Sequence, residues 1–106
     1  MSCTKYACHR LYDTATHHYS QMTVCVNGSG KLDSFSTLTE ETSFTPWIGG
    51  IIILSDKTDI PPYQNFQQLV QELTSSNQEK VYAWHISMFD FQTESLTAES
   101  VIKRLY

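Results

Sequence analysis

Long hydrophobic runs and basic residues are both scarce in this sequence, and each scarcity argues against one class of function. No stretch approaches the roughly 18 consecutive apolar residues of a membrane-spanning helix, so we expect no membrane span. The chain carries seven Lys and Arg against eleven Asp and Glu, which gives a formal net charge of −4. Because the phosphate backbone of a nucleic acid requires a basic face, we expect no nucleic-acid partner.

Cysteines are few as well, and a secretory leader is not evident. Three cysteines, an odd number, suit a reducing compartment better than a framework of disulfides. Residues 1–6 lack the apolar segment of a secretory signal. We therefore expect a cytoplasmic protein, unless an export signal was removed.

The remaining composition is that of one globular domain spanning residues 1–106. Hydrophobic residues make up 41% of the chain and charged residues 17%, which is ordinary for a soluble domain. A chain of this length can bury a core without help from disulfides or a metal.

The most informative stretch is Ile51–Leu54, four consecutive branched aliphatic residues preceded by Gly49-Gly50. Such a run cannot alternate between core and solvent, so it is typical of a short strand covered on both faces. Its shortness, its isoleucines and the polar residues after it favour a strand over a buried helical segment. We predict a central strand at 51–54 with a layer packed on each side.

Upstream of this strand the pattern predicts hairpins. Residues 3–12 and 19–26 alternate as strands, with a small polar turn between them at 13–18. Asn27-Gly28-Ser29-Gly30 is the clearest turn signal, because Asn and Gly tolerate the positive φ that hairpin turns need. The return strand is expected at 31–38, followed by a polar break at 39–43.

Downstream of the central strand, two helices and one further strand are expected. Four apolar residues at helical spacing predict an amphipathic helix over about 63–73: Phe66, Leu69, Val70 and Leu73. Residues 81–89 alternate as a strand. Four more apolar residues predict a short helix over about 97–105, capped by Thr97: Ala98, Val101, Ile102 and Leu105.

Together these elements predict an α+β domain with a mainly antiparallel sheet and both helices on one side. A right-handed crossover through the first helix would instead place strands 51–54 and 81–89 parallel.

The chain shows no motif of a metal centre. Its candidate ligands are scattered, without the close pairs that zinc sites use: Cys3, Cys8, His9, His17, His18, Cys25 and His85. We therefore expect packed cysteines and surface histidines, with no metal and no cofactor. Binding of a transition metal by His9, His17 and His18 stays open as an alternative.

Catalytic patterns are also missing. Cys8 and His9 are neighbours that a strand sends to opposite faces, which does not suit a nucleophile and its base. Glu40-Glu41 is an adjacent acidic pair in a polar loop, not two carboxylates set across a cleft. Glycine-rich phosphate motifs and G-x-S-x-G are missing too. We assign no catalytic residue and favour a non-enzymatic role, while enzyme activity stays open.

One part of the chain is similar to a known family. Val24-Cys25-Val26-Asn27-Gly28-Ser29-Gly30-Lys31-Leu32-Asp33-Ser34-Phe35 is followed at a distance by Gly49-Gly50-Ile51-Ile52-Ile53. Over residues 22–54 this order of strand, glycine turn, return strand, glycine and apolar strand resembles the small β domain that flanks the barrel in amidohydrolase-superfamily enzymes. In that family a segment carrying the metal ligands and a (β/α)₈ barrel come next, whereas here too few residues remain for a barrel. The resemblance implies an accessory β module without catalytic residues.

Two functional hypotheses follow. The first is a small domain that acts through protein–protein contact, as a homodimer or with another partner, using a sheet edge or the aromatic side chains of Tyr82 and Trp84. The alternative is a small-molecule binder or minor enzyme with a pocket between the sheet and the helix at 63–73, near His85. Candidate ligand-binding residues are His85, Trp84 and Tyr82.

Overall fold

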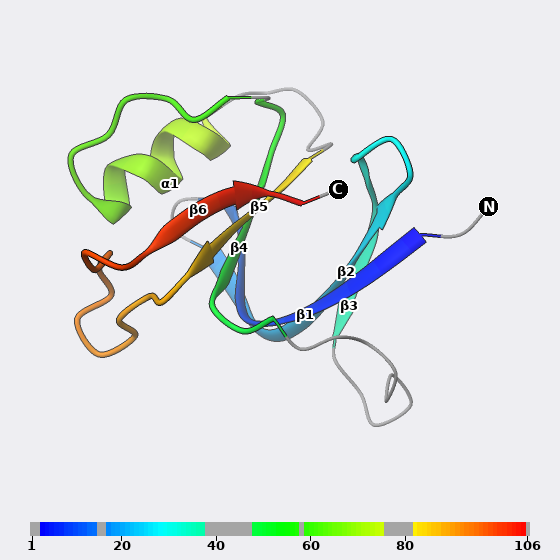
Figure 1. The fold of residues 1–106 in the computed structure, drawn as a ribbon, viewed down its shortest axis with the longest axis horizontal. Coiled ribbons are helices and arrows are strands. Elements are labelled where there is room, and N and C mark those ends of the chain that lie inside the picture. Colours follow the sequence, from blue (N-terminus) through cyan, green and yellow to red (C-terminus); the bar gives the residue numbers. More distant parts are fainter. Residues whose placement is uncertain (1–2, 15–16, 38–47, 58, 76–81, 106) are drawn as a thin grey trace.

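A computed structural model describes residues 3–14, 17–37, 48–57, 59–75 and 82–105. These residues form six strands and one α-helix (Figure 1). The strands are β1 (Cys3–Thr14), β2 (His17–Asn27), β3 (Leu32–Thr37), β4 (Ile51–Ser55), β5 (Tyr82–Ser87) and β6 (Val101–Arg104), and the helix is α1 (Phe66–Thr74). The fold is α+β, with more strand than helix.

All six strands belong to one sheet, in the order β3-β2-β1-β4-β5-β6. Every neighbouring pair is antiparallel except β1 and β4, which are parallel. The prediction of a mainly antiparallel sheet is confirmed. The parallel alternative for β4 and β5 is wrong, because Ile51 pairs with Ile86 in an antiparallel ladder.

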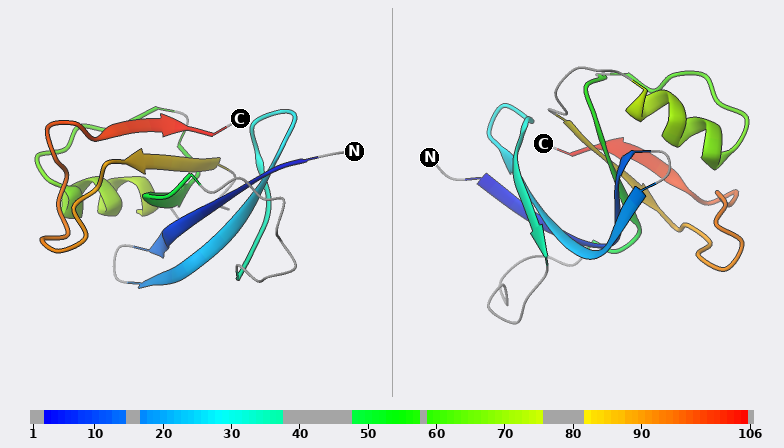
Figure 2. Two further views of the ribbon diagram at one scale, coloured as in Figure 1. Left: turned by 60° about the horizontal axis from the view of Figure 1, so that its bottom comes forward. Right: turned by 180° about the vertical axis from the view of Figure 1, so that it is seen from behind.

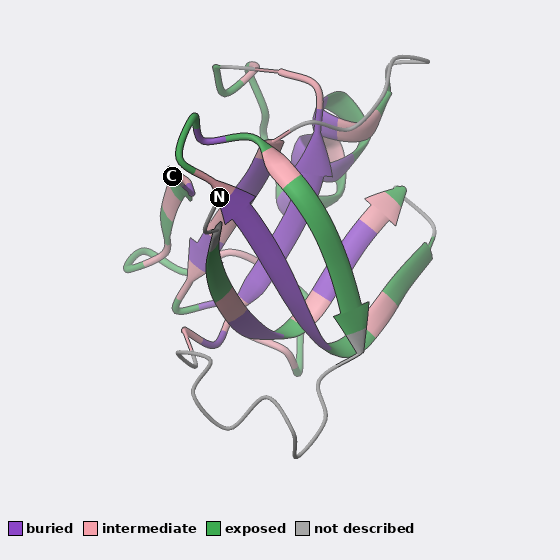
Figure 3. Cartoon of the chain, turned by 90° about the vertical axis from the view of Figure 1, so that its right-hand side faces the viewer, coloured by how far each residue is buried: buried purple, intermediate pink, exposed green. Residues whose placement is uncertain are grey.

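β4 is the central strand that the isoleucine run predicted. Every residue from Ile51 to Ser55 is buried, within the buried middle of the sheet that Figure 3 displays. Ile51 and Ile53 face the side that α1 covers, whereas Ile52 and Leu54 face the other side. Because both faces carry a core, the strand has no alternation of polar and apolar residues.

The first predicted helix is confirmed, with its ends shifted to Phe66–Thr74. Asn65 caps it, since its side-chain oxygen accepts a hydrogen bond from the Gln68 backbone N–H at 2.8 Å. The four residues at helical spacing are buried against the sheet, and each contributes roughly 1.5–3 kcal/mol through burial. At the other end, the Ser55 hydroxyl donates to the Leu73 carbonyl at 2.6 Å and holds the helix on β4.

A second core lies on the face of the sheet that α1 does not cover, and its buried residues are Cys8, Leu11, Met22, Val24, Val26, Ile52, Leu54, Ala83 and Leu105. Cys8 and Leu11 both face this core although they are three positions apart, so the alternation of β1 shifts by one residue between them. Gln21 on β2, beside this shift, has a positive φ of 53°. Figure 2 shows β1 and β2 bending, and their apolar residues thereby pack onto Ile52 and Leu54 of β4.

The predicted helix over 97–105 is wrong. Thr97 does begin one turn, because its carbonyl oxygen accepts a hydrogen bond from the Ser100 backbone N–H at 3.1 Å. Val101 then starts β6, which pairs with the outer edge of β5. Because successive side chains of a strand point to opposite faces, Ile102 packs on the core under α1, whereas Val101 is 58% exposed. A free strand edge, together with two β-branched residues, favours a strand over a helix here.

The hairpin turn between β2 and β3 is confirmed. The Gly30 N–H donates to the Asn27 carbonyl at 3.0 Å, and Gly30 has a φ of 77°. The Asn27 side-chain oxygen accepts from the Ser29 and Lys31 backbone N–H groups, which closes the turn. The polar break at 39–43, which includes Glu40-Glu41, lies outside the described residues.

The helical part of the described chain contains no segment of the length and apolar character that crossing a membrane requires.

Candidate functional site

A cavity of about 410 Å³ opens on the face of the sheet that α1 does not cover. It is lined by one residue from each of three strands and by two residues flanking the strands: Tyr6 of β1, His85 of β5, Lys103 of β6, Ile48 and Leu105. Its volume falls within the roughly 300–1,000 Å³ that small-molecule sites occupy.

Strand alternation and register bring the two basic side chains of this site together. Trp84 and Ile86 of β5 face α1, so His85 between them faces the opposite side. Lys103 of β6 pairs directly with His85. Side chains that are directly opposite in an antiparallel pair lie on the same face of the sheet, about 5 Å apart at their Cβ atoms. Both residues therefore line the same wall.

His85 is half-buried, and its ring is held by the backbone before β4. Its Nε2 lies 3.0 Å from the Gly49 carbonyl oxygen. Burial lowers the pKa of His85 below 6.5 and the charge of Lys103 lowers it further, while hydrogen bonds with the Gly49 and Ile48 backbones oppose them. The lowered pKa favours the uncharged ring, and in that form the hydrogen lies on Nε2, because the Gly49 carbonyl can only accept. The other ring nitrogen, Nδ1, is then an acceptor.

The glycines beside the site allow this close contact. Gly49 and Gly50 have φ values of 66° and 64°, which L side chains rarely adopt. A Cβ on Gly50 would overlap the Ile86 carbonyl oxygen and lie 3.2 Å from His85 Nε2. On the other side, the Gly50 N–H donates to His9 Nδ1 at 3.1 Å. The pair of glycines thus lets the chain pass closely between β1 and β5.

Lys103 places one positive charge in the wall of the cavity, in a chain whose net charge is −4. None of the described residues that line the cavity is acidic. Lys103 is exposed, and it forms no ion pair with any residue that the structure describes. Ile48 and Leu105 supply an apolar floor and pack against the second core. Two nitrogen groups beside an apolar surface suit a ligand with one polar end and an apolar body.

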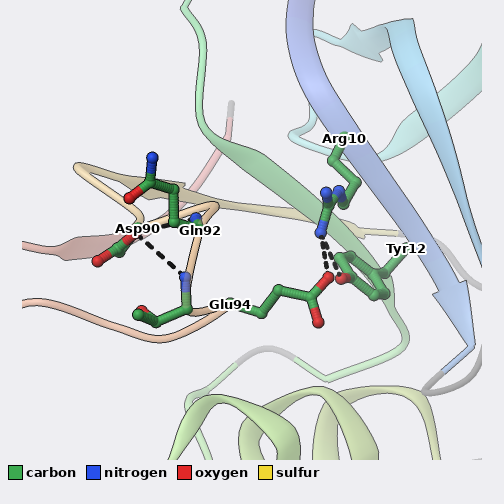
Figure 4. Close-up of polar contacts among 6 residues, drawn as sticks. Arg10, Tyr12, Asp90, Gln92 and Glu94 are labelled. Atoms are coloured by element: carbon green, nitrogen blue, oxygen red, sulfur yellow. Dashed lines mark hydrogen bonds and ion pairs between the residues drawn. The ribbon is translucent and has the colours of Figure 1, made fainter.

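A second polar cluster joins the loop after β5 to the bend of β1 (Figure 4). Arg10 Nη1 donates to Glu94 Oε1 at 3.1 Å and to the Tyr12 hydroxyl at 3.3 Å. The Arg10 guanidinium also lies 5.3 Å from the centre of the Phe91 ring, which lies 5.2 Å from the His9 ring. The guanidinium is thus engaged by three neighbours and anchors the loop.

The same loop is closed by Asp90. Its carboxylate accepts from the backbone N–H groups of Thr93 and Gln92, which lowers the pKa of Asp90 below its ordinary value. Because these acidic and basic groups are committed to one another and to the backbone, we assign this cluster a structural role.

The three predicted ligand-binding residues do not lie together. His85 lines the cavity, but Trp84 is 5% exposed in the core under α1 and donates from Nε1 to the Lys57 carbonyl at 3.1 Å. Tyr82 lies under the Arg104 guanidinium, 4.9 Å from its ring centre. The expected pocket between sheet and helix does not include His85, because the core fills that face and His85 points away from it. The aromatic pair is also away from a free sheet edge, since β5 lies between β4 and β6.

The histidines proposed as metal ligands have other partners. His17 Nδ1 lies 3.0 Å from Asp13 Oδ1, and His18 packs against the Tyr12 ring at 5.1 Å. His9 accepts from Gly50, as described above. Within the described ranges no three His, Cys, Asp or Glu side chains are grouped so that they can hold a metal ion.

The cysteines differ from the expectation of free thiols. Cys25 is disulfide-bonded. Cys8 is free and buried, and burial raises the pKa of its thiol to about 11. A thiol of this kind is packed and unreactive at neutral pH, as the sequence predicted for a semi-buried cysteine.

Sequence reasoning found His85 but missed the other four residues that line the cavity. The helix predicted over 97–105 contains Lys103 and Leu105, and a helix has no strand register with His85. Tyr6 was correctly placed on a strand, but its closeness to His85 depends on the parallel pairing of β1 with β4, which brings distant segments together.

Comparison with protein-family models, with curated protein sequences and with solved structures gave no match. The resemblance of residues 22–54 to an amidohydrolase-flanking β domain therefore stays a prediction.

Proposed function

We propose that this protein binds a small molecule in the cavity beside His85. The observation that carries the proposal is the pairing of His85 with Lys103 above the apolar side chains of Ile48 and Leu105. Polar groups that are few and placed on rigid strands give orientation, and apolar contact gives most of the affinity. Binding, and not catalysis, is what this set of residues supports, since it pairs no nucleophile with a base.

The test is a titration with a simple apolar probe that carries one polar end. Hexanol or hexanoate should shift the NMR signals of the Ile48 and Leu105 methyl groups and of the His85 ring. The methyl signals of Val101, which is 58% exposed and does not line the cavity, serve as the internal control. If neither probe moves the Ile48 and Leu105 signals ahead of the Val101 signals, the proposal is wrong.

A second candidate is contact with a partner chain through β6. β6 is an outer strand of the sheet, and two apolar side chains near it are well exposed: Val101 at 58% and Met88 at 60%. Unpaired strand edges with exposed apolar residues are a common route to association, including homodimers. A dimer mass in gel filtration with light scattering, lost in Val101→Lys, would support this candidate. A monomer mass at every concentration would exclude the homodimer.

The expected cytoplasmic location is a separate proposal, and the disulfide at Cys25 counts against it. Disulfides persist in oxidising compartments and are rare in the cytosol. A ligand-binding or partner-binding module is also compatible with the accessory β domain that the amidohydrolase resemblance implies.

A further inference from the structure

Resting on the proposed function, we infer that the ligand of the cavity is a small organic carboxylate and that its binding brings a proton onto His85. Three observations support this: the placement of Lys103, the hydrogen bond of the His85 ring and the apolar floor formed by Ile48 and Leu105.

Lys103 selects for a negative charge. Among the described residues that line the cavity, its ammonium group is the one permanent cation and no side chain is acidic. It pairs with His85 across β5 and β6, so both side chains leave the sheet on the same face. An anion held between them would gain a charge-assisted hydrogen bond from each, and such bonds are about twice as strong as neutral ones.

His85 can donate to such an anion only when it is protonated. Its Nε2 is already bonded to the Gly49 carbonyl, so the neutral ring offers an acceptor at Nδ1. A carboxylate oxygen could form no hydrogen bond with this nitrogen, because both atoms are acceptors. Protonation of Nδ1 turns the same contact into an N–H donor and an ion pair, while the Nε2–Gly49 hydrogen bond is kept.

The groups around His85 explain why the proton arrives with the ligand. Lys103 faces it from β6 and opposes its charged form, whereas Ile52, opposite it on β4, carries no charge. Tyr6 of β1 and the Ile48–Gly49 backbone complete the surroundings. A bound carboxylate neutralises the effect of Lys103 and adds a negative charge beside the ring, so protonation and binding favour each other.

The apolar floor distinguishes an organic acid from an inorganic anion. Ile48 and Leu105 line the cavity together with the basic pair. Phosphate or sulfate would leave this surface uncovered, whereas an aliphatic or aromatic acid would bury it, and burial of apolar surface favours binding. We therefore expect hexanoate to bind more tightly than inorganic phosphate.

The experiment compares three probes of equal chain length: hexanoate, hexanol and hexylamine. Dissociation constants are measured by NMR titration for the whole chain at several pH values between about 6 and 8. Hexanoate should bind best, and a few-fold more tightly at pH 6 than at pH 8 if the pKa of His85 rises by about one unit on binding, with about tenfold as the upper limit. Hexanol should show no such dependence, and hexylamine should bind least.

Direct titration of the His85 ring signal tests the proton step without any variant. Its pKa should rise when hexanoate is added and stay unchanged with hexanol. Among variants, His85→Gln keeps an N–H for Gly49 and should flatten the pH dependence. Lys103→Ala should weaken hexanoate binding at least about fivefold, as removal of a coupled charge does, while Lys31→Ala in the β2–β3 turn should not.

The outcomes separate the two proposals. If hexanol and hexanoate bind equally and shift the Ile48 methyl signals, the cavity binds ligands but the inference of a carboxylate is wrong. If hexanoate binds more tightly without changing the pKa of His85, the proton step is wrong. If no probe reaches Ile48 or Leu105, the proposed function itself fails.

Discussion

Gly50 is a residue on which both the cavity and the packing of the strands depend. Its backbone lies against the Ile86 carbonyl on one side and bonds to His9 on the other. Its positive φ of 64° suits glycine, so the close approach and the backbone conformation exclude a side chain for two separate reasons. The His85 ring reaches the Gly49 carbonyl because Gly49 and Gly50 have no side chains that would block the approach.

Gly50→Ala is expected to lower the free energy of unfolding by about 2–4 kcal/mol, since it adds both steric overlap and backbone strain. Urea denaturation measures the change. Gly28→Ala is the matched control, because a Cβ at Gly28 would meet no atom within 4 Å. Equal stability of the two variants would contradict the contact between Gly50 and β5.

His85 also predicts how stability depends on pH. Its pKa in the folded protein lies below the ordinary value of 6.5, so the unfolded chain takes up the proton first as the pH falls. The free energy of unfolding should therefore be unaffected well above pH 6.5 and decrease as the pH falls below it. In thermal unfolding, His85→Gln should show a smaller decrease over this range. Val101→Thr, at an exposed position without a titratable group, is the control and should show the wild-type decrease.

At the scale of elements, α1 depends on its first turn. It has no acidic residue in its first turn and no basic residue in its last, so charge contributes little to its ends. The Asn65 cap and the buried face of the helix supply its stability instead.

Asn65→Ala should lower the free energy of unfolding by about 1 kcal/mol, the usual cost of losing an N-cap. Asn65→Ser should restore most of it, because a serine hydroxyl can accept the same Gln68 N–H. Chemical denaturation of the three proteins checks this order. A neutral Asn65→Ala change would mean that packing alone holds the helix in place.

The elements also show what local sequence can predict. Ile51–Leu54 is unambiguous, because four branched residues in a row need two covered faces, and the structure provides both. The apolar spacing of residues 97–105 predicts a helix, but Val101–Arg104 forms a strand. The strand forms because residues 101–104 pair with the edge of β5, and this pairing partner cannot be predicted from the residues around 97–105. Lys103 lies on the same strand, so its position beside His85 in the cavity could not be predicted from the sequence for the same reason.

At the scale of the whole molecule, one sheet carries two cores. The core under α1 and the core inside the coiled part of the sheet share β4, and the disulfide at Cys25 lies on β2, which belongs to the second core. The register sets Cys25 opposite Lys5, and places Cys3 two positions away on the same neighbouring strand.

Thiol counting tests the disulfide. After denaturation without reductant, the chain should react at one thiol, that of Cys8, and after reduction at all three cysteines. Cys25→Ser should lower the free energy of unfolding by roughly 2–4 kcal/mol. Three reactive thiols in protein prepared under oxidising conditions would show that the bond does not form.

The position of β1 has a consequence for how the chain can be divided. The first strand of the sequence lies in the interior of the sheet, hydrogen-bonded to β2 on one side and to β4 on the other. A cut between β3 and β4 would leave two fragments, each with a bare interior edge and an incomplete share of the apolar packing. Neither piece should fold alone, but mixed together they should reassemble along β1 and β4, which makes this junction a natural point for a split reporter.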